Sequence, residues 1–338
     1  MRIGYKIFLL MSLTTYCNID KNEVDTIDNI ISPPKPSIST TLTKSIIHND
    51  IKREYIIHIP GKYSKEKQTP LLFCFHGYSS SANTIMLYSN FNEIADTAGF
   101  IVAYPQGALF HKSNKTHFNV GGFTKGSLSD DVDFTRKLID SISLEYNVDQ
   151  RRIYSTGMSN GGFMSFLLAC QLSDKIAAIA SVTGSMSPEI FEQCNPKRPI
   201  PIMIIHGDKD RIVPYRHVKY KRNSKSIPEV LNYWVNHNNC GEICDTIIIS
   251  NVNKQDSSHV HHIIYSNEDS KIDIEHLKIV GGYHSWPGIK EDFDIHQNDE
   301  IETFFTRYNI RVNMDINASK EIWKFFSKYD INGRITKN

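Results

Sequence analysis

The sequence carries almost no excess of charge of either sign. Its 338 residues include 38 lysines and arginines against 37 aspartates and glutamates, so the formal net charge is +1. Proteins whose main partner is nucleic acid or an anionic membrane usually concentrate positive charge. We therefore expect no nucleic acid partner, and we expect a substrate without net charge.

Cysteines at metal-binding spacing are also absent from the sequence. None of the six cysteines forms a Cys-x-x-Cys pair, a spacing found in many structural zinc sites and thiol redox sites. The segment His259-Val260-His261-His262 gathers histidines, but no carboxylate or cysteine stands beside it in a pattern typical of a metal site. We expect no metal ion and no cofactor, and we place this histidine cluster on the surface of a polar hairpin.

The apolar stretch at the start of the chain is too short to span a bilayer as a helix. It runs from Ile7 to Leu13 after a positively charged start, which is typical of a secretory signal peptide over residues 1–17. Cys17 stands where a lipoprotein signal places its acylated cysteine, although Tyr16 is bulkier than the residue expected there. The sequence therefore fits two locations: secretion from the cell, or attachment to the cell envelope by a lipid on Cys17.

The composition fits one globular domain. Hydrophobic residues make up 40% of the chain and charged residues 22%, which is ordinary for a soluble protein, and we find no internal repeat. Residues 18–44 include a proline cluster and a serine and threonine run, which are typical of a flexible linker. We expect a folded domain over residues 45–329, a tail over residues 330–338, and a monomer.

Export would favour disulfide bonds among the remaining cysteines. Cys74 lies inside an expected buried strand, where it would serve as a small apolar residue. Cys170 and Cys194 are candidates for one bridge, and Cys240 and Cys244 for another that closes a short loop.

Apolar runs that fit buried strands alternate along the chain with segments that fit helices. Strands are expected at residues 54–60, 71–75, 100–105, 153–156, 176–182, 200–205 and 277–280, and helices at 130–146, 163–169, 226–239 and 318–326. This alternation predicts an α/β fold, with a mostly parallel central sheet and helices on both faces.

One strand-to-helix junction carries a chemical signature. It reads Gly157-Met158-Ser159-Asn160-Gly161, between the strand at residues 153–156 and the helix that begins near Phe163. In such a sharp turn the serine adopts a strained backbone conformation with its hydroxyl exposed, and the glycines let strand and helix approach closely. Ser159 is therefore the candidate nucleophile. A plain glycine and serine turn is the alternative.

A serine nucleophile needs a general base, and the base needs an acid that orients it. The strand at residues 200–205 ends in a loop that contains Asp208 and Asp210, and the strand at residues 277–280 ends in a loop that contains His284. We expect His284 to be the base and one of the two aspartates to be the acid. Two further histidines at strand ends, His76 and His206, are expected to bond neighbouring backbone.

Attack of a serine on a carbonyl group also needs donors for the negative oxygen of the tetrahedral intermediate. One donor is expected to be the N–H of Asn160, at the start of the helix that follows the nucleophile. The other should come from the loop after residues 71–75, where His76-Gly77 allows a tight turn. We assign it to the N–H of Tyr78.

Aromatic side chains lie close to these motifs in the sequence. Tyr78, Phe123, Tyr215 and Trp286 are candidates for binding a phenolic acyl group or a sugar ring. The alternatives are that the Tyr78 ring is a surface aromatic, that Phe123 belongs to a turn, and that Trp286 packs the loop of the base.

Four motifs in this order resemble the secreted polyhydroxybutyrate depolymerase and feruloyl esterase group, near carbohydrate esterase family one. The motifs are Phe75-His76-Gly77-Tyr78, Gly157 to Gly162, His206-Gly207 to Asp210 with Val213-Pro214-Tyr215, and Gly282 to Gly288. The resemblance runs from about Ser45 to about Tyr329 and implies an α/β-hydrolase fold and a serine esterase.

The resemblance also bears on the choice of acid. The group usually places the acid four residues after the histidine of His-Gly, which favours Asp210 and leaves Asp208 as a loop or capping carboxylate. The chain departs from the group's pattern at Asp208, where a small residue is usual, and in the charged insertion at residues 289–314, whose role the sequence does not indicate.

These observations predict a secreted serine carboxylic ester hydrolase that acts through an acyl-enzyme. Feruloyl or acetyl esters of plant polysaccharide are the expected substrates, and polyhydroxybutyrate is the alternative. A non-catalytic binding protein on a hydrolase scaffold is the alternative of another class. The complete set of Ser159, Asp210 and His284 counts against it, because a chain without catalysis has no need of all three.

Overall fold

The computed structural model describes residues 38–217, 223–241, 243–289 and 311–336. Several predictions fall outside these residues: the signal peptide over residues 1–17 with Cys17, the linker up to residue 37, and the insertion from residue 290 to residue 310. The side chain of Cys244 is outside as well, so the pairing of Cys240 with Cys244 stays a prediction.

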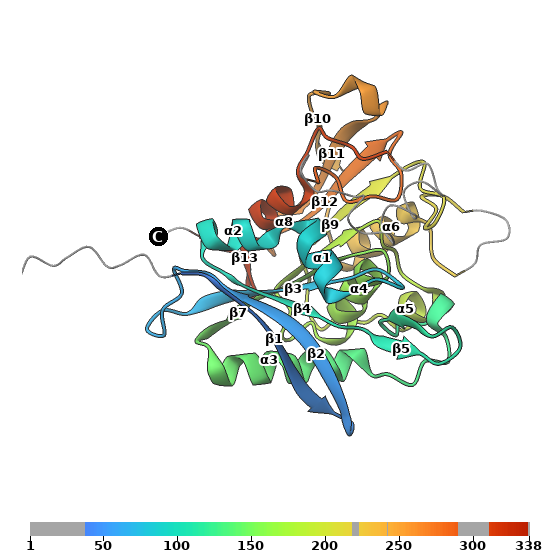
Figure 1. The fold of residues 1–338 in the computed structure, drawn as a ribbon. Helices are drawn as coiled ribbons and strands as arrows, with labels where there is room; N and C mark the ends of the chain where they lie inside the picture. The colour runs from blue at the N-terminus through green and yellow to red at the C-terminus, as the bar shows by residue number, and fades with distance from the viewer. Residues whose placement is uncertain (1–37, 218–222, 242, 290–310, 337–338) are drawn as a thin grey trace, which may run out of the picture. The chain divides into compact units, whose positions relative to one another are not determined.

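A ten-stranded sheet runs through the described part of the chain in the order β1-β2-β4-β3-β7-β8-β9-β12-β11-β10 (Figure 1). From β4 to β12 neighbouring strands are parallel. The strands outside this part pair antiparallel, β2 with β4 and β1 at one side, β11 and β10 at the other. The bounds are β1 Thr40–His48, β2 Ile51–Ile59, β3 Thr69–Phe75, β4 Ile101–Pro105, β7 Val148–Met158, β8 Ala178–Val182, β9 Ile202–Gly207, β10 Ile243–Ile248, β11 His259–Asn267 and β12 Ile272–Val280.

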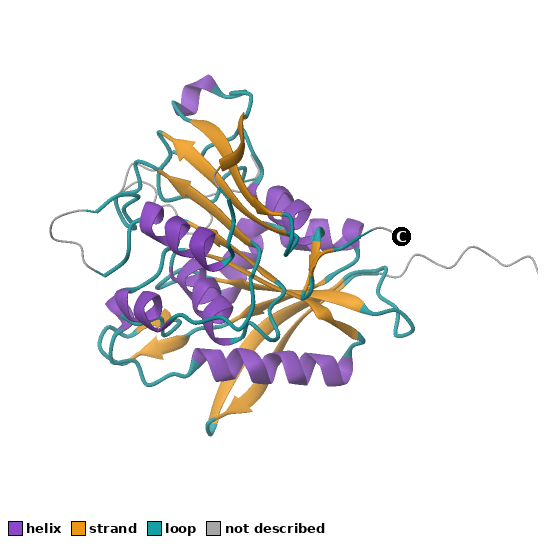
Figure 2. Ribbon diagram, turned by 180° about the vertical axis from the view of Figure 1, so that it is seen from behind, coloured by secondary structure: helices purple, strands orange, loops and turns teal. Residues whose placement is uncertain are grey.

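Helices cover both faces of this sheet (Figures 1 and 2). Helices α1 (Ala82–Ser89), α2 (Phe91–Ala98) and α8 (Ala318–Phe326) share one buried cluster with the sheet. Helices α3 (Asp131–Glu145), α4 (Asn160–Gln171), α5 (Pro188–Gln193) and α6 (Ile227–His237) share the other. Successive side chains of a strand point to opposite faces, so β3 sends Phe73 to one cluster and Cys74 to the other. The predicted mostly parallel sheet with helices on both faces is confirmed.

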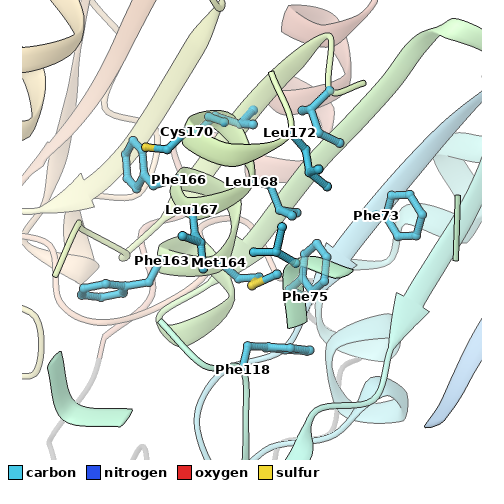
Figure 3. Packing of buried hydrophobic residues seen from close by; sticks show 14 of the residues in the cluster. Phe73, Phe75, Phe118, Phe163, Met164, Phe166, Leu167, Leu168, Cys170 and Leu172 are labelled. Atoms are coloured by element: carbon cyan, nitrogen blue, oxygen red, sulfur yellow. The ribbon is translucent and has the colours of Figure 1, made fainter. Parts of the chain in front are cut away.

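Helix α4, which follows Ser159, is buried from Asn160 to Cys170. Figure 3 labels side chains of α4, among them Phe163 and Leu168, within the buried cluster that also contains Phe75 of β3. Full burial of one such phenylalanine or leucine contributes about 1.5–3 kcal/mol to stability. The start of α4 is therefore held in place by a large apolar contact area.

Three of the four predicted helix starts are confirmed by their capping contacts, whereas the helix expected to begin near Phe163 begins at Asn160. Asp130 accepts a hydrogen bond from the N–H of Asp133 at the start of α3, and Asn317 accepts one from Lys320 at the start of α8. At α6, Ser226 and Glu229 form a reciprocal capping box. Each contact satisfies an N–H group that the first turn of a helix leaves without a partner.

The predicted bridge between Cys170 and Cys194 is present, with the two Cα atoms 4.9 Å apart. It joins the last turn of α4 to the residue that follows α5. Cys74 is buried within β3, as predicted. The bridge thus ties the helix behind the nucleophile to the segment that leads into β9.

The ends of the folded domain differ from the sequence prediction, and so do the bounds of several strands. Strand β1 begins at Thr40, inside the predicted linker 18–44; most of its side chains are exposed, so no apolar alternation marks it. The predicted tail forms the hairpin of β13 (Tyr329–Asp330) and β14 (Gly333–Arg334), where the guanidinium of Arg334 binds Asp273 at 2.7 Å. The histidine cluster lies in β11, which pairs antiparallel with β10 and β12 within the main sheet, and its three histidines are partly exposed.

Candidate active site

Ser159 lies between the end of β7 and the start of α4, with φ 53° and ψ −117°. A positive φ is costly for a residue with a Cβ and persists only where the surroundings impose it. Here the Ser159 N–H donates to the carbonyl of Val182 (2.9 Å), and the Ser159 carbonyl accepts from Phe163 N–H (3.0 Å). The strained turn that the sequence predicts is therefore present, and its side chain is only partly buried.

The glycines on either side of Ser159 are required by close backbone contacts. A Cβ on Gly161 would lie 2.1 Å from the carbonyl oxygen of Phe75, and a Cβ on Gly157 would lie 2.6 Å from the same oxygen. Both contacts are far inside van der Waals distance, and the neighbouring atoms are backbone that cannot turn away. The junction of β7, β3 and α4 therefore excludes any side chain at these positions.

We expect Gly161→Ala to destabilise the protein by about 3 kcal/mol or more, because the added methyl group overlaps backbone atoms and forces β3 and α4 apart. Thermal unfolding should show a melting temperature several degrees lower. Gly241→Ala is the matched control, since a Cβ there meets nothing within 4 Å, and its effect should stay within about 0.5 kcal/mol. Equal melting temperatures for the two variants would contradict the packing argument.

The structure places His284 against Asp210. The Nδ1 atom of His284 lies 2.7 Å from Oδ2 of Asp210, and both side chains are buried. Their loops follow β12 and β9, which are adjacent parallel strands, so their carboxyl ends lie at the same edge of the sheet. The other oxygen of Asp210 accepts from the N–H groups of Ile212 (2.8 Å) and Val213 (2.9 Å). These bonds fix the carboxylate with Oδ2 toward the histidine.

The electrostatic surroundings keep Asp210 ionised. Burial alone would raise its pKa, but the interactions with the neighbouring His284 and His206 outweigh burial and hold the pKa of Asp210 well below its usual range. The Nε2 atom of His206 lies 3.4 Å from Oδ2 of Asp210. An ionised carboxylate on Nδ1 leaves Nε2 of His284 as the atom that can take a proton.

Asp208 has a different position. Its Oδ1 atom accepts the N–H of Gly281 at 2.8 Å, and its own N–H donates to the carbonyl of Ile279 at 3.0 Å. The carboxylate therefore joins the loop after β9 to the loop after β12. The carboxylate that contacts the His284 ring is therefore that of Asp210 and not that of Asp208.

The loop after β3 lies beside Ser159. A Cβ on Gly77 would be 3.6 Å from Cβ of Ser159, so the two segments that carry the predicted donors, Tyr78 and Asn160, flank the serine. His76 orders this loop: its Nε2 accepts the N–H of Gly107 (2.9 Å), which leaves its Nδ1–H to donate to the carbonyl of Gly77 (2.7 Å). Burial lowers the pKa of His76 to about 4, so the ring is neutral near pH 7.

Two of the four predicted substrate-binding aromatics lie together. The rings of Tyr78 and Phe123 meet edge to face at 5.9 Å, and Phe123 meets Phe163 in the same way at 5.4 Å. Both Tyr78 and Phe123 are partly exposed. Because Tyr78 belongs to the loop after β3, this aromatic pair includes that loop.

The other two predicted aromatics lie in the interior. Trp286 is 1% exposed and donates its indole N–H to Ser319 at 3.0 Å. Tyr215 is 8% exposed, and its hydroxyl bonds Nε2 of His276 at 2.9 Å. Because packing and polar contacts already occupy both rings, the structure does not bring them to a surface that a substrate can reach.

Sequence reasoning missed the hairpin of β5 (Ala108–Phe110) and β6 (Lys115–His117), which lies against the loop after β3. The N–H of Ser79 donates to the carbonyl of Thr116 at 2.8 Å. Strands of three residues are too short for an apolar period. The sequence therefore gave no signal for this contact.

Among the residues that the structure describes, no three histidine, cysteine or acidic side chains are grouped so that they could hold a metal ion. None of the helices within the described ranges has the length and apolar character needed to cross a membrane.

A family described as phospholipase/carboxylesterase matches residues 62–242. The bifunctional acetylxylan esterase/xylanase XynS20E of Neocallimastix patriciarum is 28% identical over 241 residues, 70% of this chain and 32% of that protein. Feruloyl esterase B of Piromyces equi is 36% identical over 165 residues, 48% of this chain and 30% of that protein. Poly(3-hydroxyalkanoate) depolymerase C of Paucimonas lemoignei is 28% identical over 129 residues, 38% of this chain and 30% of that protein. The chain thus spans about a third of the length of these curated relatives.

Solved structures share the fold at low sequence identity. An acetyl xylan esterase from Aspergillus awamori aligns with a TM-score of 0.54 at 14% identity, over 78% of this chain and 98% of that one. An S-formylglutathione hydrolase from Agrobacterium tumefaciens aligns with a TM-score of 0.54 at 10% identity, over 89% of this chain and 99% of that one. The expected α/β-hydrolase fold is confirmed. Because the family match covers more than half of its residues, the chain belongs to the phospholipase/carboxylesterase family of α/β-hydrolases.

Proposed function

We propose that the chain is a secreted serine ester hydrolase that cleaves feruloyl or acetyl esters of plant polysaccharide through an acyl-enzyme. The observation that carries the proposal is the 2.7 Å contact between His284 Nδ1 and Asp210 Oδ2, in loops at the sheet edge where Ser159 occupies its strained turn. A nucleophile, a base and an oriented acid are the three parts that acyl transfer by serine requires.

In the first half of the reaction, Oγ of Ser159 attacks the ester carbonyl carbon and Nε2 of His284 takes the hydroxyl proton. The bond from the carbonyl carbon to the sugar oxygen then breaks, and that oxygen takes the proton from the imidazolium and leaves as an alcohol. In the second half, a water molecule attacks the acyl carbon and gives a proton to Nε2 of His284; the bond to Oγ of Ser159 then breaks, Oγ takes the proton back, and the carboxylic acid leaves. Asp210 stays ionised throughout and stabilises the imidazolium.

The developing oxyanion is bound by the N–H groups of Tyr78 and Asn160. Asn160 is the first residue of α4, where the unsatisfied N–H groups and the helix dipole favour negative charge. A preorganised donor in a site of this kind contributes about 10²–10³ in turnover. The two donors come from separate segments, so their spacing depends on how the loop after β3 is held against α4.

The substrate class rests on the relatives and on the aromatic pair. Two relatives are named as an acetylxylan esterase and a feruloyl esterase, and the partly exposed rings of Tyr78 and Phe123 offer a surface for a planar phenolic acyl group. One relative is named as a polyhydroxyalkanoate depolymerase, which keeps polyester as the second candidate. The proposal that the protein is secreted rests on residues 1–17 alone, whose sequence is typical of a signal peptide.

We expect one purified preparation to cleave methyl ferulate or acetylated xylo-oligosaccharide with a higher kcat/KM than polyhydroxybutyrate film. A soluble ester needs only one acyl group to reach Ser159, whereas a film must be gripped over a wide apolar surface. Parallel assays of released ferulate, acetate and hydroxybutyrate decide the order, with Ser159→Ala as the blank. Faster release from film would make polyester the substrate, and no Ser159-dependent release from any ester would favour a binding protein.

A further inference from the structure

The side chain of Asn160 does not face the solvent or the reacting atoms. It is fully buried and forms two hydrogen bonds with the backbone of one residue, Phe118. The N–H of Phe118 donates to Oδ1 at 2.8 Å, and Nδ2 donates to the carbonyl of Phe118 at 3.0 Å. A pair of bonds to one peptide fixes both its distance and its orientation.

Phe118 ends a segment, Gly107–Phe118, that also holds the loop after β3. The Thr116 carbonyl accepts the N–H of Ser79 at 2.8 Å, and the Thr116 hydroxyl donates to the carbonyl of Ser80 at 2.5 Å. At the other end, the N–H of Gly107 donates to His76 at 2.9 Å. One segment therefore contacts both sides of the candidate oxyanion site: the start of α4 through Asn160, and the loop that carries Tyr78.

We propose that the Asn160 side chain is a positioning residue, which acts through the segment Gly107–Phe118 to set the distance between the two oxyanion donors. The inference rests on the proposed function, because it concerns the same N–H groups. Donors must lie about 2.7–3.1 Å from the oxyanion to be effective. A misplacement of about 1 Å can lower turnover about 10²-fold.

The chain contains a second asparagine with the same bonding pattern, and it lies away from the site. Asn238 accepts the N–H of Ile200 at 3.1 Å and donates to the carbonyl of Ile200 at 2.6 Å, and its side chain is also fully buried. Ile200 precedes β9, whereas Asp210 and Ser159 follow the ends of their strands. Asn238 is therefore a matched control that makes the same contacts without the catalytic neighbour.

The test compares Asn160→Ala with Asn238→Ala in the full chain. Both variants should lose similar amounts of thermal stability, because each leaves a buried peptide without two hydrogen bonds. With p-nitrophenyl acetate, Asn160→Ala should lower kcat about 10- to 100-fold and leave KM within about threefold, since the donors act on the transition state. Asn238→Ala should keep kcat within about threefold of wild type.

A boronic acid inhibitor gives a readout that a purely structural role would not move. Oγ of Ser159 adds to the trigonal boron, its proton passes to His284, and one boron-bound oxygen takes the oxyanion position. For Asn160→Ala the dissociation constant of the boronic acid should rise by about the factor by which kcat/KM falls. Thr116→Val tests the other end of the segment at a partly exposed position, and we expect it to lower kcat about 3- to 10-fold.

Similar kcat values for Asn160→Ala and Asn238→Ala, or an unchanged boronic acid affinity, would overturn the inference and leave the proposed function standing. If Asn160→Ala does not fold, wild-type kcat in Thr116→Val would overturn it instead. A wild-type protein without Ser159-dependent ester hydrolysis would overturn the proposed function, and the inference with it.

Discussion

Asp210→Asn is expected to lower kcat about 10⁴-fold, whereas Asp208→Asn should leave kcat within about threefold of wild type. Asp210 holds His284 by a 2.7 Å contact to Nδ1, and an amide there can present its NH₂ group to Nδ1 and favour the wrong tautomer. Asp208 holds the N–H of Gly281, which an asparagine oxygen can still accept. The two variants are therefore matched in chemistry and differ only in position.

The same pair of variants predicts a dependence of stability on pH. Because the pKa of Asp210 is lower in the folded protein than in the unfolded chain, its ionisation stabilises the fold above the unfolded value of about 4. That contribution is lost as the pH falls below about 4 toward the folded pKa. Urea unfolding at pH 7 and pH 3 should show the difference between wild type and Asp210→Asn shrinking at the lower pH.

The reverse ranking of the two aspartates in turnover would transfer the acid role to Asp208. Small effects in both variants would mean that His284 needs no carboxylate partner. A difference in stability between wild type and Asp210→Asn that grows at pH 3 would contradict the direction of the pKa shift.

The strand-turn-helix at Ser159 was predictable because its signals are local. Gly157 and Gly161 mark the close approach of backbones, and the strained serine follows from that geometry. Helix starts such as Asp130 and Asn317 were predictable for the same reason, since a cap bonds residues only three positions away.

Two questions depend on contacts between residues far apart in the sequence: which aspartate is the acid, and which of the predicted aromatic side chains are exposed. Asp208 and Asp210 stand two positions apart in one loop, and only their distances to residues 281 and 284 separate them. Nothing in the sequence around Trp286 indicates that its ring is buried, with an edge-to-face contact to Phe91 and a hydrogen bond to Ser319. Tertiary packing decides such positions, and a single sequence does not record it.

Edge and hairpin strands were missed because their exposed residues lack an apolar pattern. Strand β1 is polar and mostly exposed, so its Ser and Thr residues suggest a linker. The short strands β5 and β6 are held by contacts with the loop after β3 rather than by their own propensity. Such segments are specified by their partners.

The central claim is that Ser159 is the nucleophile, and the most direct test is the rate of p-nitrophenyl acetate hydrolysis by Ser159→Ala. The control is Ser165→Ala, which removes a serine hydroxyl within α4 that is buried and donates to the carbonyl of Gly161. We expect Ser159→Ala to keep the wild-type circular dichroism spectrum and to lower kcat by about 10⁶, while Ser165→Ala keeps kcat within about threefold. Hydrolysis by folded Ser159→Ala at a rate near that of wild type would contradict the account.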